Sequence, residues 1–275
     1  MAHLITASEL AAELDGDTPP VVLDVRWQLG RTDGIDHYRA GHIPGAVFVD
    51  LDHELASHGE PTEGRHPLPA IADLQRAARR WGINDSDRVV VYDNIKSNAA
   101  ARAWWVLRWA GLADVRVLDG ALPAWVASGG ALTEGDVVAA PGTVRLDPGH
   151  LPVLTIDEVA QFPSHGVLLD ARAPERYRGD VEPLDPRAGH IPGALNAPSS
   201  GNVGADGRFL PADELAQHYR SAGVREGAAV AAYCGSGITA SHDILALAIA
   251  GIDAALYPGS FSAWSNTEDR PVDIG

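Results

Sequence analysis

The sequence predicts two tandem α/β domains, each a parallel sheet flanked by helices on both faces. Three observations support this fold class. The chain has 275 residues, enough for two ordinary domains; its motifs occur twice in the same order; and strand-like and helix-like segments alternate within each copy. We expect a first domain over residues 1–137, a linker over 138–152 and a second domain over 153–275.

The internal repeat is the strongest of these signals. One seven-residue motif, Ala-Gly-His-Ile-Pro-Gly-Ala, occurs letter for letter in both halves. An apolar run that ends in an acid and an arginine precedes each copy, and a second apolar run follows it. The matching pairs are Ala40–Ala46 with Ala188–Ala194, Val21–Arg26 with Val167–Arg172, and Val89–Asp93 with Val230–Cys234. Because their order is the same in both halves, the chain arose by duplication.

The elements of each copy follow from short apolar runs and longer helical patterns. Runs of strand length with turn-rich flanks predict strands at Val21–Val25, Val89–Tyr92, Val115–Leu118, Val167–Leu169, Val230–Tyr233 and Ala254–Tyr257. Helices are expected at Ile71–Trp81, Ala99–Ala110, Ala212–Ala222 and Ala240–Ala250, with a short amphipathic helix between Thr6 and Leu14. Gly135–Pro152 is rich in glycine and proline, as is typical of a linker. Such alternation predicts parallel sheets.

Composition excludes several classes of function. The formal net charge of −16 repels nucleic acid and anionic lipid, so we expect neither as a partner. Met1–Gly16 shows no signal-peptide pattern, and the longest apolar run, Ile244–Ile252, is too short to span a bilayer. A single cysteine forms no internal disulfide and no multi-thiolate metal site. We therefore expect a cytoplasmic protein with no metal and no cofactor.

The two halves differ where the loop after the central strand leads into a helix. The second half has Tyr233-Cys-Gly-Ser-Gly-Ile-Thr239, whereas the first has Tyr92-Asp-Asn-Ile-Lys-Ser-Asn98. In α/β sheets this edge is where ligands bind. A tight glycine-containing loop ahead of a helix can turn successive N–H groups toward Cys234, which favours thiolate over thiol. A buried, inert cysteine is the alternative, but this context favours a nucleophile.

The spacing around Cys234 separates several families of thiolate and anion loops. A cysteine phosphatase needs an arginine six residues after the nucleophile, and position 240 is alanine. A thioredoxin-like site needs a second cysteine, and a P-loop needs Gly-Lys-Ser/Thr at the start of the helix; neither is present. What remains is a cysteine in a loop with fixed backbone dipoles and no charged side chain.

These features together resemble the tandem rhodanese family over nearly the whole chain. The duplicated domains, the Gly-His-Ile-Pro-Gly-Ala motif in each, and Cys234-Gly-Ser-Gly-Ile-Thr239 carry the resemblance. The loop is similar to that of the 3-mercaptopyruvate sulfurtransferase branch, since the thiosulfate branch usually has basic residues just after the cysteine. The resemblance implies a catalytically silent first domain. It also implies a cycle in which Cys234 accepts a sulfur atom as a persulfide and passes it on.

The resemblance also implies roles for other residues. Ser236 would form a proton relay with His66 and Asp52, with Asp50 as an alternative to Asp52; a helix-start serine and a loop histidine are the structural alternative. Arg176 would bind the carboxylate of the donor, and Arg187 is the candidate for a second substrate-binding arginine because the family's own has no clean counterpart. The backbone of four loop residues would hold the persulfide: Gly235, Gly237, Ile238 and Thr239.

The function that follows is sulfur transfer from 3-mercaptopyruvate through Cys234 to a thiol or to cyanide. The thiol would belong to a thioredoxin-like protein or to a small molecule. Thiosulfate as the donor is the alternative within enzymes. A non-catalytic sulfur carrier or regulatory module is the alternative from another class, and it would show no turnover. The repeated His42 and His190 lie in both halves, including the one without a cysteine, so we expect them to stabilise turns.

Overall fold

The computed structural model describes residues 2–275, which fall into two compact units. Among the described residues, unit 1 comprises 2–57, 69–150 and 205–208. Unit 2 comprises residues 58–68, 151–204 and 209–275. Residues 58–68 and 205–208 therefore each belong to a different unit from the residues on either side of them. The stretch 58–68 matters most, because it comes from the first half of the chain and joins the unit that contains Cys234.

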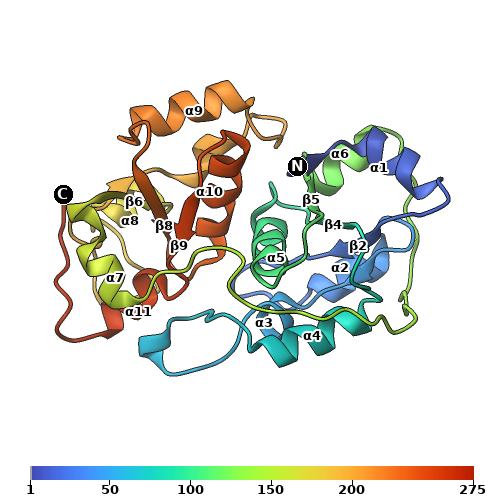
Figure 1. Ribbon diagram of the computed structural model, residues 1–275, viewed down its shortest axis with the longest axis horizontal. Coiled ribbons are helices and arrows are strands. Elements are labelled where there is room, and N and C mark those ends of the chain that lie inside the picture. The colour runs from blue at the N-terminus through green and yellow to red at the C-terminus, as the bar shows by residue number, and fades with distance from the viewer. Residues whose placement is uncertain (1) are drawn as a thin grey trace. The chain divides into compact units, whose positions relative to one another are not determined.

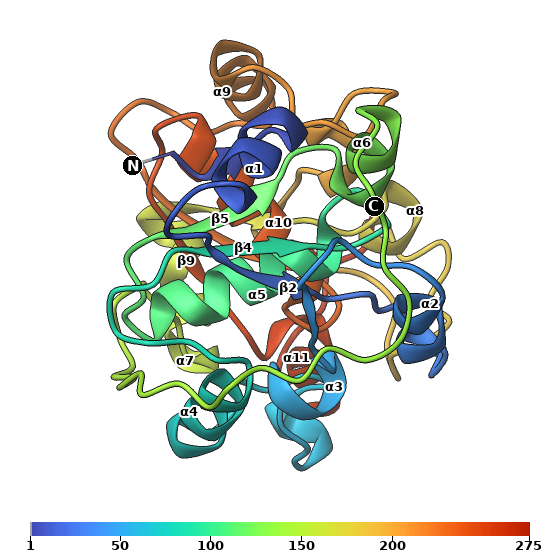
Figure 2. The same cartoon turned by 90° about the vertical axis from the view of Figure 1, so that its right-hand side faces the viewer.

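Unit 1 is a five-stranded parallel sheet in the order β1-β5-β4-β2-β3. Figure 2 shows α1 and α6 on one face of this sheet, with α4 and α5 on the other. Its elements are β1 (Leu4–Ile5), α1 (Ala7–Leu14), β2 (Val21–Asp24), α2 (Gly34–Ala40), β3 (Val47–Phe48), α3 (Leu51–Glu54), α4 (Ile71–Arg80), β4 (Val89–Tyr92), α5 (Asn98–Trp109), β5 (Val115–Leu118) and α6 (Ala121–Ala127).

Unit 2 is a four-stranded parallel sheet in the order β7-β6-β8-β9. In Figure 1, α9 and α10 cover one face and α7 and α11 the other. Its elements are η1 (Pro61–Glu63), α7 (Ile156–Gln161), η2 (Phe162–Ser164), β6 (Gly166–Asp170), α8 (Pro174–Tyr177), β7 (Leu195–Asn196), η3 (Ser199–Asn202), α9 (Ala212–Ser221), β8 (Ala229–Tyr233), α10 (Ile238–Ile249), β9 (Ala254–Leu256) and α11 (Ser260–Asn266).

Alternating side chains of the central strands fill both cores. Val90 and Tyr92 of β4 pack with the α1 and α6 side of unit 1, and Ala231 and Tyr233 of β8 pack with Phe261 and the rest of the core beneath α7 and α11. Strands covered on both faces are apolar throughout, which is why the sequence shows them as continuous runs. The predicted α/β architecture with two parallel sheets is confirmed.

The repeated motifs stabilise equivalent turns in the two units. The His42 ring stacks on Tyr38 and its Nδ1 lies 3.0 Å from the carbonyl oxygen of that residue. His190 stacks on Tyr177 in the same way, with its Nδ1 2.8 Å from the Tyr177 oxygen. The two histidines are therefore structural, as predicted. Among residues 2–275, no helix is both long and apolar enough to cross a membrane.

Candidate active site

Cys234 directly follows β8 and is buried, with 2% of its surface exposed. Four residues later the chain enters α10, and Gly237, just before the helix, makes the turn with a left-handed φ of 82° that favours glycine. The N–H of Gly237 donates to Sγ of Cys234 at 3.1 Å. The sulfur therefore lies at the amino end of a twelve-residue helix and accepts a backbone hydrogen bond, and both features stabilise negative charge on it.

The start of α11 holds the cysteine loop from the other side. The N–H groups of Phe261 and Ser262 donate to the carbonyl oxygens of Cys234 and Gly235, each at 2.9 Å. The Ser260 hydroxyl accepts the N–H of Cys234 at 3.2 Å. Ser260 itself has a φ of 54°, a strained value for a residue other than glycine. These hydrogen bonds from α11 hold the backbone of the cysteine loop, in which the Gly237 N–H points to the sulfur.

The four residues predicted to hold the persulfide lie in this turn and at the start of α10. Gly235 and Gly237 lie in the turn, and Ile238 and Thr239 are the first two residues of the helix. Ile238 is buried and Thr239 is partly exposed. Of these four residues, Gly237 donates a hydrogen bond to Sγ.

Two of the three predicted relay residues meet in unit 2. Oγ of Ser236 and Nδ1 of His66 are 2.8 Å apart, and both side chains are buried. His66 reaches this place because residues 58–68 belong to unit 2. Asp52 lies on α3 of unit 1, where its Oδ1 accepts the Trp27 indole N–H at 2.8 Å. Asp50, the alternative to Asp52, caps the start of α3 and pairs with His53.

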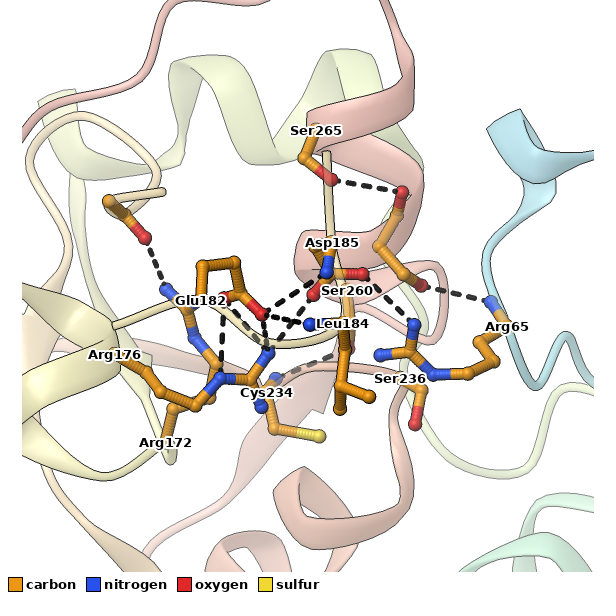
Figure 3. Close-up of polar contacts among 12 residues, drawn as sticks. Arg65, Arg172, Arg176, Glu182, Leu184, Asp185, Cys234, Ser236, Ser260 and Ser265 are labelled. Carbon is orange, nitrogen blue, oxygen red and sulfur yellow. Dashed lines mark hydrogen bonds and ion pairs between the residues drawn. The ribbon is translucent and has the colours of Figure 1, made fainter. Parts of the chain in front are cut away.

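Arg176, on α8, points toward the cysteine loop and is held by two buried carboxylates (Figure 3). Its Nη2 donates to Oε1 of Glu182 at 2.7 Å and to Oδ2 of Asp185 at 3.1 Å. A second arginine, Arg65, reaches the other oxygen of Asp185 with Nη1 at 3.0 Å. No motif singles out Arg65, although it directly precedes His66. Glu182 and Asp185 were also missed, because acidic loop residues are usually solvated.

Arg187 does not join this cluster through any hydrogen bond. All three of its guanidinium nitrogens donate to main-chain carbonyls at and beyond the carboxyl end of α11, those of Trp264, Ser265, Thr267 and Arg270. Arg187 lies in the loop just before the repeated motif, against this chain end. Its guanidinium therefore stabilises the carboxyl end of α11.

Arg172 is structural as well. It forms a buried ion pair with Asp170 at 2.6 Å, and its Nη1 reaches Glu182 at 3.3 Å. Burial by itself lowers the pKa of Arg172, but Asp170, together with Tyr233 and Glu182, raises it overall. Arg26 pairs with Asp24 in the same way in unit 1. The acid and arginine of the repeated motif are thus an internal brace rather than a reactive pair.

Unit 1 has a carboxylate where unit 2 has the thiol. Asp93 follows β4, and its two carboxylate oxygens accept four backbone N–H groups of the loop at 2.8–3.1 Å, those of Ile95, Ser97, Ala99 and Ala100. Burial raises the pKa of Asp93, while these four bonds act in the opposite direction. The loop of unit 1 is thus an anion-binding nest that the chain fills with its own carboxylate.

Comparison with known proteins identifies this architecture. The family model for the rhodanese-like domain matches residues 6–128 and 155–267. The chain belongs to the rhodanese family.

Its relatives within the family carry two different donor names. The chain is 48% identical over 99% of its length to a Mycobacterium tuberculosis protein named "Putative thiosulfate sulfurtransferase SseB", of which the match covers 97%. It is 45% identical over its whole length, and over 99% of the relative, to a Pseudomonas aeruginosa protein named "Probable 3-mercaptopyruvate sulfurtransferase". The crystal structure of the Escherichia coli 3-mercaptopyruvate enzyme SseA superimposes with a TM-score of 0.84 at 32% identity, covering 94% of this rhodanese and 99% of SseA.

Proposed function

We propose that this rhodanese takes sulfur from 3-mercaptopyruvate, holds it as a persulfide on Cys234, and passes it to a thiol or to cyanide. One observation carries the proposal. The chain's single cysteine accepts a backbone N–H at the start of α10, beside two arginines, in the unit whose counterpart has only a carboxylate at the equivalent position.

The first half-reaction needs no net proton. The Cys234 thiolate attacks the donor's sulfur, an S–S bond forms, and the C–S bond breaks with its electron pair going to carbon as the enolate of pyruvate. The proton of the donor's thiol ends on that carbon. Ser236 and His66, joined at 2.8 Å, can carry this proton, and Arg176 can hold the carboxylate of the donor meanwhile.

The second half-reaction regenerates the thiolate. A thiolate acceptor attacks the outer sulfur of the persulfide, which forms a new S–S bond and releases Cys234 as a thiolate. With cyanide as the acceptor, the outer sulfur leaves as thiocyanate. The helix start and the Gly237 N–H stabilise the negative sulfur before and after transfer.

A donor comparison tests the proposal. We expect kcat/KM for 3-mercaptopyruvate to exceed that for thiosulfate, with cyanide as acceptor in both assays. Thiosulfate is a dianion, and both guanidiniums beside the loop are already paired with carboxylates. A higher kcat/KM for thiosulfate would move the enzyme to the donor that the M. tuberculosis relative is named for.

The proposal also includes a thiol as the physiological sulfur acceptor and the cytoplasm as the location of the protein. We infer a small thiol or a thioredoxin-like protein as acceptor, because attack on a persulfide requires a thiolate that can reach a buried sulfur. A lone reduced cysteine suits the reducing cytoplasm. Turnover with reduced thioredoxin or glutathione in place of cyanide tests the acceptor, and cell fractionation tests the location.

A further inference from the structure

Arg65 has no assigned role, and it lies beside the cysteine loop. It comes from residues 58–68, which α11 holds in place: the Arg65 N–H donates to Oγ of Ser262 at 2.9 Å. Gly64 packs directly on Gly259, where a β-carbon would lie only 2.6 Å from the Gly259 oxygen. The same helix start binds the carbonyls of Cys234 and Gly235. Arg65 and the cysteine loop are therefore anchored to one element.

One edge of each guanidinium faces this loop without a partner. A β-carbon on Gly235 would lie 3.3 Å from Nη1 of Arg176 and 3.5 Å from Nη2 of Arg65. Within residues 2–275, no hydrogen bond engages either of these nitrogens, and the buried Nε of Arg65 has no partner either. Unpaired donors of this kind next to a reactive sulfur form a site for an anion.

Asp185 holds the two guanidiniums in this arrangement (Figure 3). Its side chain is only 1% exposed, and its two oxygens divide between Arg65 at 3.0 Å and Arg176 at 3.1 Å. Glu182, 4% exposed, accepts hydrogen bonds from Nε and Nη2 of Arg176. Two cations therefore face two buried anions, and Arg172 is balanced by Asp170. The cluster directs hydrogen-bond donors at the loop while it adds no net positive charge.

We propose that Arg65 is the second donor-binding arginine and that Asp185 aims both guanidiniums and sets the preference for a singly charged carboxylate. This inference rests on the proposed use of 3-mercaptopyruvate. A carboxylate has two oxygens for the two free edges. Thiosulfate, a dianion, gains more from net positive charge than a monocarboxylate does, so Asp185 selects against it.

The first test replaces Arg65. Arg65→Ala should raise KM for 3-mercaptopyruvate roughly ten- to hundredfold with little change in kcat, because a charge-assisted bond made in the ground state is lost. The inhibition constant of pyruvate should rise in parallel. Arg65→Lys should fall between the two, since it keeps the charge and loses the planar fork. The matched control is Arg178→Ala, whose exposed guanidinium pairs with Asp180.

The second test replaces Asp185. Asp185→Asn adds one unit of net positive charge, so the ratio of kcat/KM for thiosulfate to that for 3-mercaptopyruvate should rise by roughly tenfold. Asp180→Asn is the exposed control. Thermal unfolding of each variant separates lost affinity from lost fold. An unchanged ratio in a folded Asp185→Asn protein would overturn the role of Asp185.

Different results would refute the proposed donor and the proposed role of Arg65. A wild-type protein that loads Cys234 from thiosulfate and not from 3-mercaptopyruvate would refute the proposed donor. A folded Arg65→Ala protein with wild-type KM for 3-mercaptopyruvate and wild-type inhibition by pyruvate would refute the assignment of Arg65 alone.

Discussion

Ser236 connects the cysteine loop to a histidine from the first half of the chain. Its hydroxyl lies two residues after the nucleophile and 2.8 Å from His66. A proton must reach carbon when 3-mercaptopyruvate releases its sulfur, whereas thiosulfate releases sulfite and needs no such transfer. The roles of Ser236 in catalysis and in structure can therefore be told apart by changing the donor.

Ser236→Ala should lower kcat with 3-mercaptopyruvate by roughly a hundredfold, a usual contribution of general acid–base catalysis. The residual turnover with thiosulfate should stay near the wild-type value. Steady-state kinetics with both donors measure the effect, and Ser221→Ala, at the exposed end of α9, is the control. An equal loss with both donors would show that the hydroxyl only supports the loop.

Residue types and spacing were enough to predict the cysteine loop, but not the arginine beside it. Cys234 and Gly237 could be predicted because the strand, tight turn and helix are contiguous in sequence. Arg65 could not, because its closeness to Gly235 depends on a segment from the other half of the chain. Arg187 was a plausible substitute by sequence position, and its guanidinium donates to four carbonyls at and beyond the carboxyl end of α11.

At the scale of elements, the loops after β4 and β8 are two versions of one anion site. In unit 2 the loop faces the Cys234 sulfur, which accepts the Gly237 N–H, and in unit 1 it faces the Asp93 carboxylate, which accepts four N–H groups. The Asp93 loop thus has a structural role in unit 1. Replacing its carboxylate should affect stability rather than chemistry.

Asp93→Ala should lower the free energy of unfolding by roughly 2–6 kcal/mol, since four buried N–H groups lose their acceptor at about 0.5–1.5 kcal/mol each. kcat per folded molecule should stay within a few-fold of the wild type. Urea unfolding and kinetics on the folded fraction measure both quantities. A hundredfold loss of kcat in the folded variant would contradict the division of labour between the halves.

Helix α10 carries a buried acid that makes stability depend on pH. Asp243 is fully buried, accepts Nδ2 of Asn202 at 2.7 Å, and burial raises its pKa well above 3.8. Above pH 3.8 the unfolded chain loses this proton while the folded chain keeps it. The folded state is then disfavoured, so stability falls as pH rises toward the raised pKa.

Asp243→Asn should remove this dependence. The variant should gain stability relative to the wild type between pH 5 and 8, by at most about 1.4 kcal/mol per pH unit for one proton. Urea unfolding at several pH values measures the difference, with the exposed Asp253→Asn as control. Parallel stability curves for the wild type and Asp243→Asn would contradict the buried, protonated Asp243.

Long apolar strands and helices were predictable, and two-residue strands were not. The predicted strand at Val89–Tyr92 matches β4, and the helix expected at Ile71–Trp81 matches α4 within one residue. β1, β3 and β7 are too short to show a period and depend on pairing with distant strands. The role of α11 in holding the loop was also hidden, because it depends on contacts 26 or 27 residues away in sequence.

For the whole molecule, duplication explains why the two units have similar parallel sheets. The residue after the central strand distinguishes them, because it is Asp93 in unit 1 and Cys234 in unit 2. The repeat predicted two parallel sheets from sequence alone, since the order of motifs survives changes in loop length. It could not show that residues 58–68 belong to unit 2, because no composition change marks that segment. Unit 2 is therefore built from both halves of the chain, and Cys234 is its single cysteine.

The most direct test of this account is the mass of the intact protein after treatment with 3-mercaptopyruvate and removal of excess donor. We predict that the wild type gains the mass of one sulfur atom per chain, because Cys234 is the only thiol and Asp93 occupies the equivalent position. Folded Cys234→Ser should gain none, and cyanide should return the wild type to its starting mass. Sulfur on the Cys234→Ser protein, or turnover by it, would contradict the central claim.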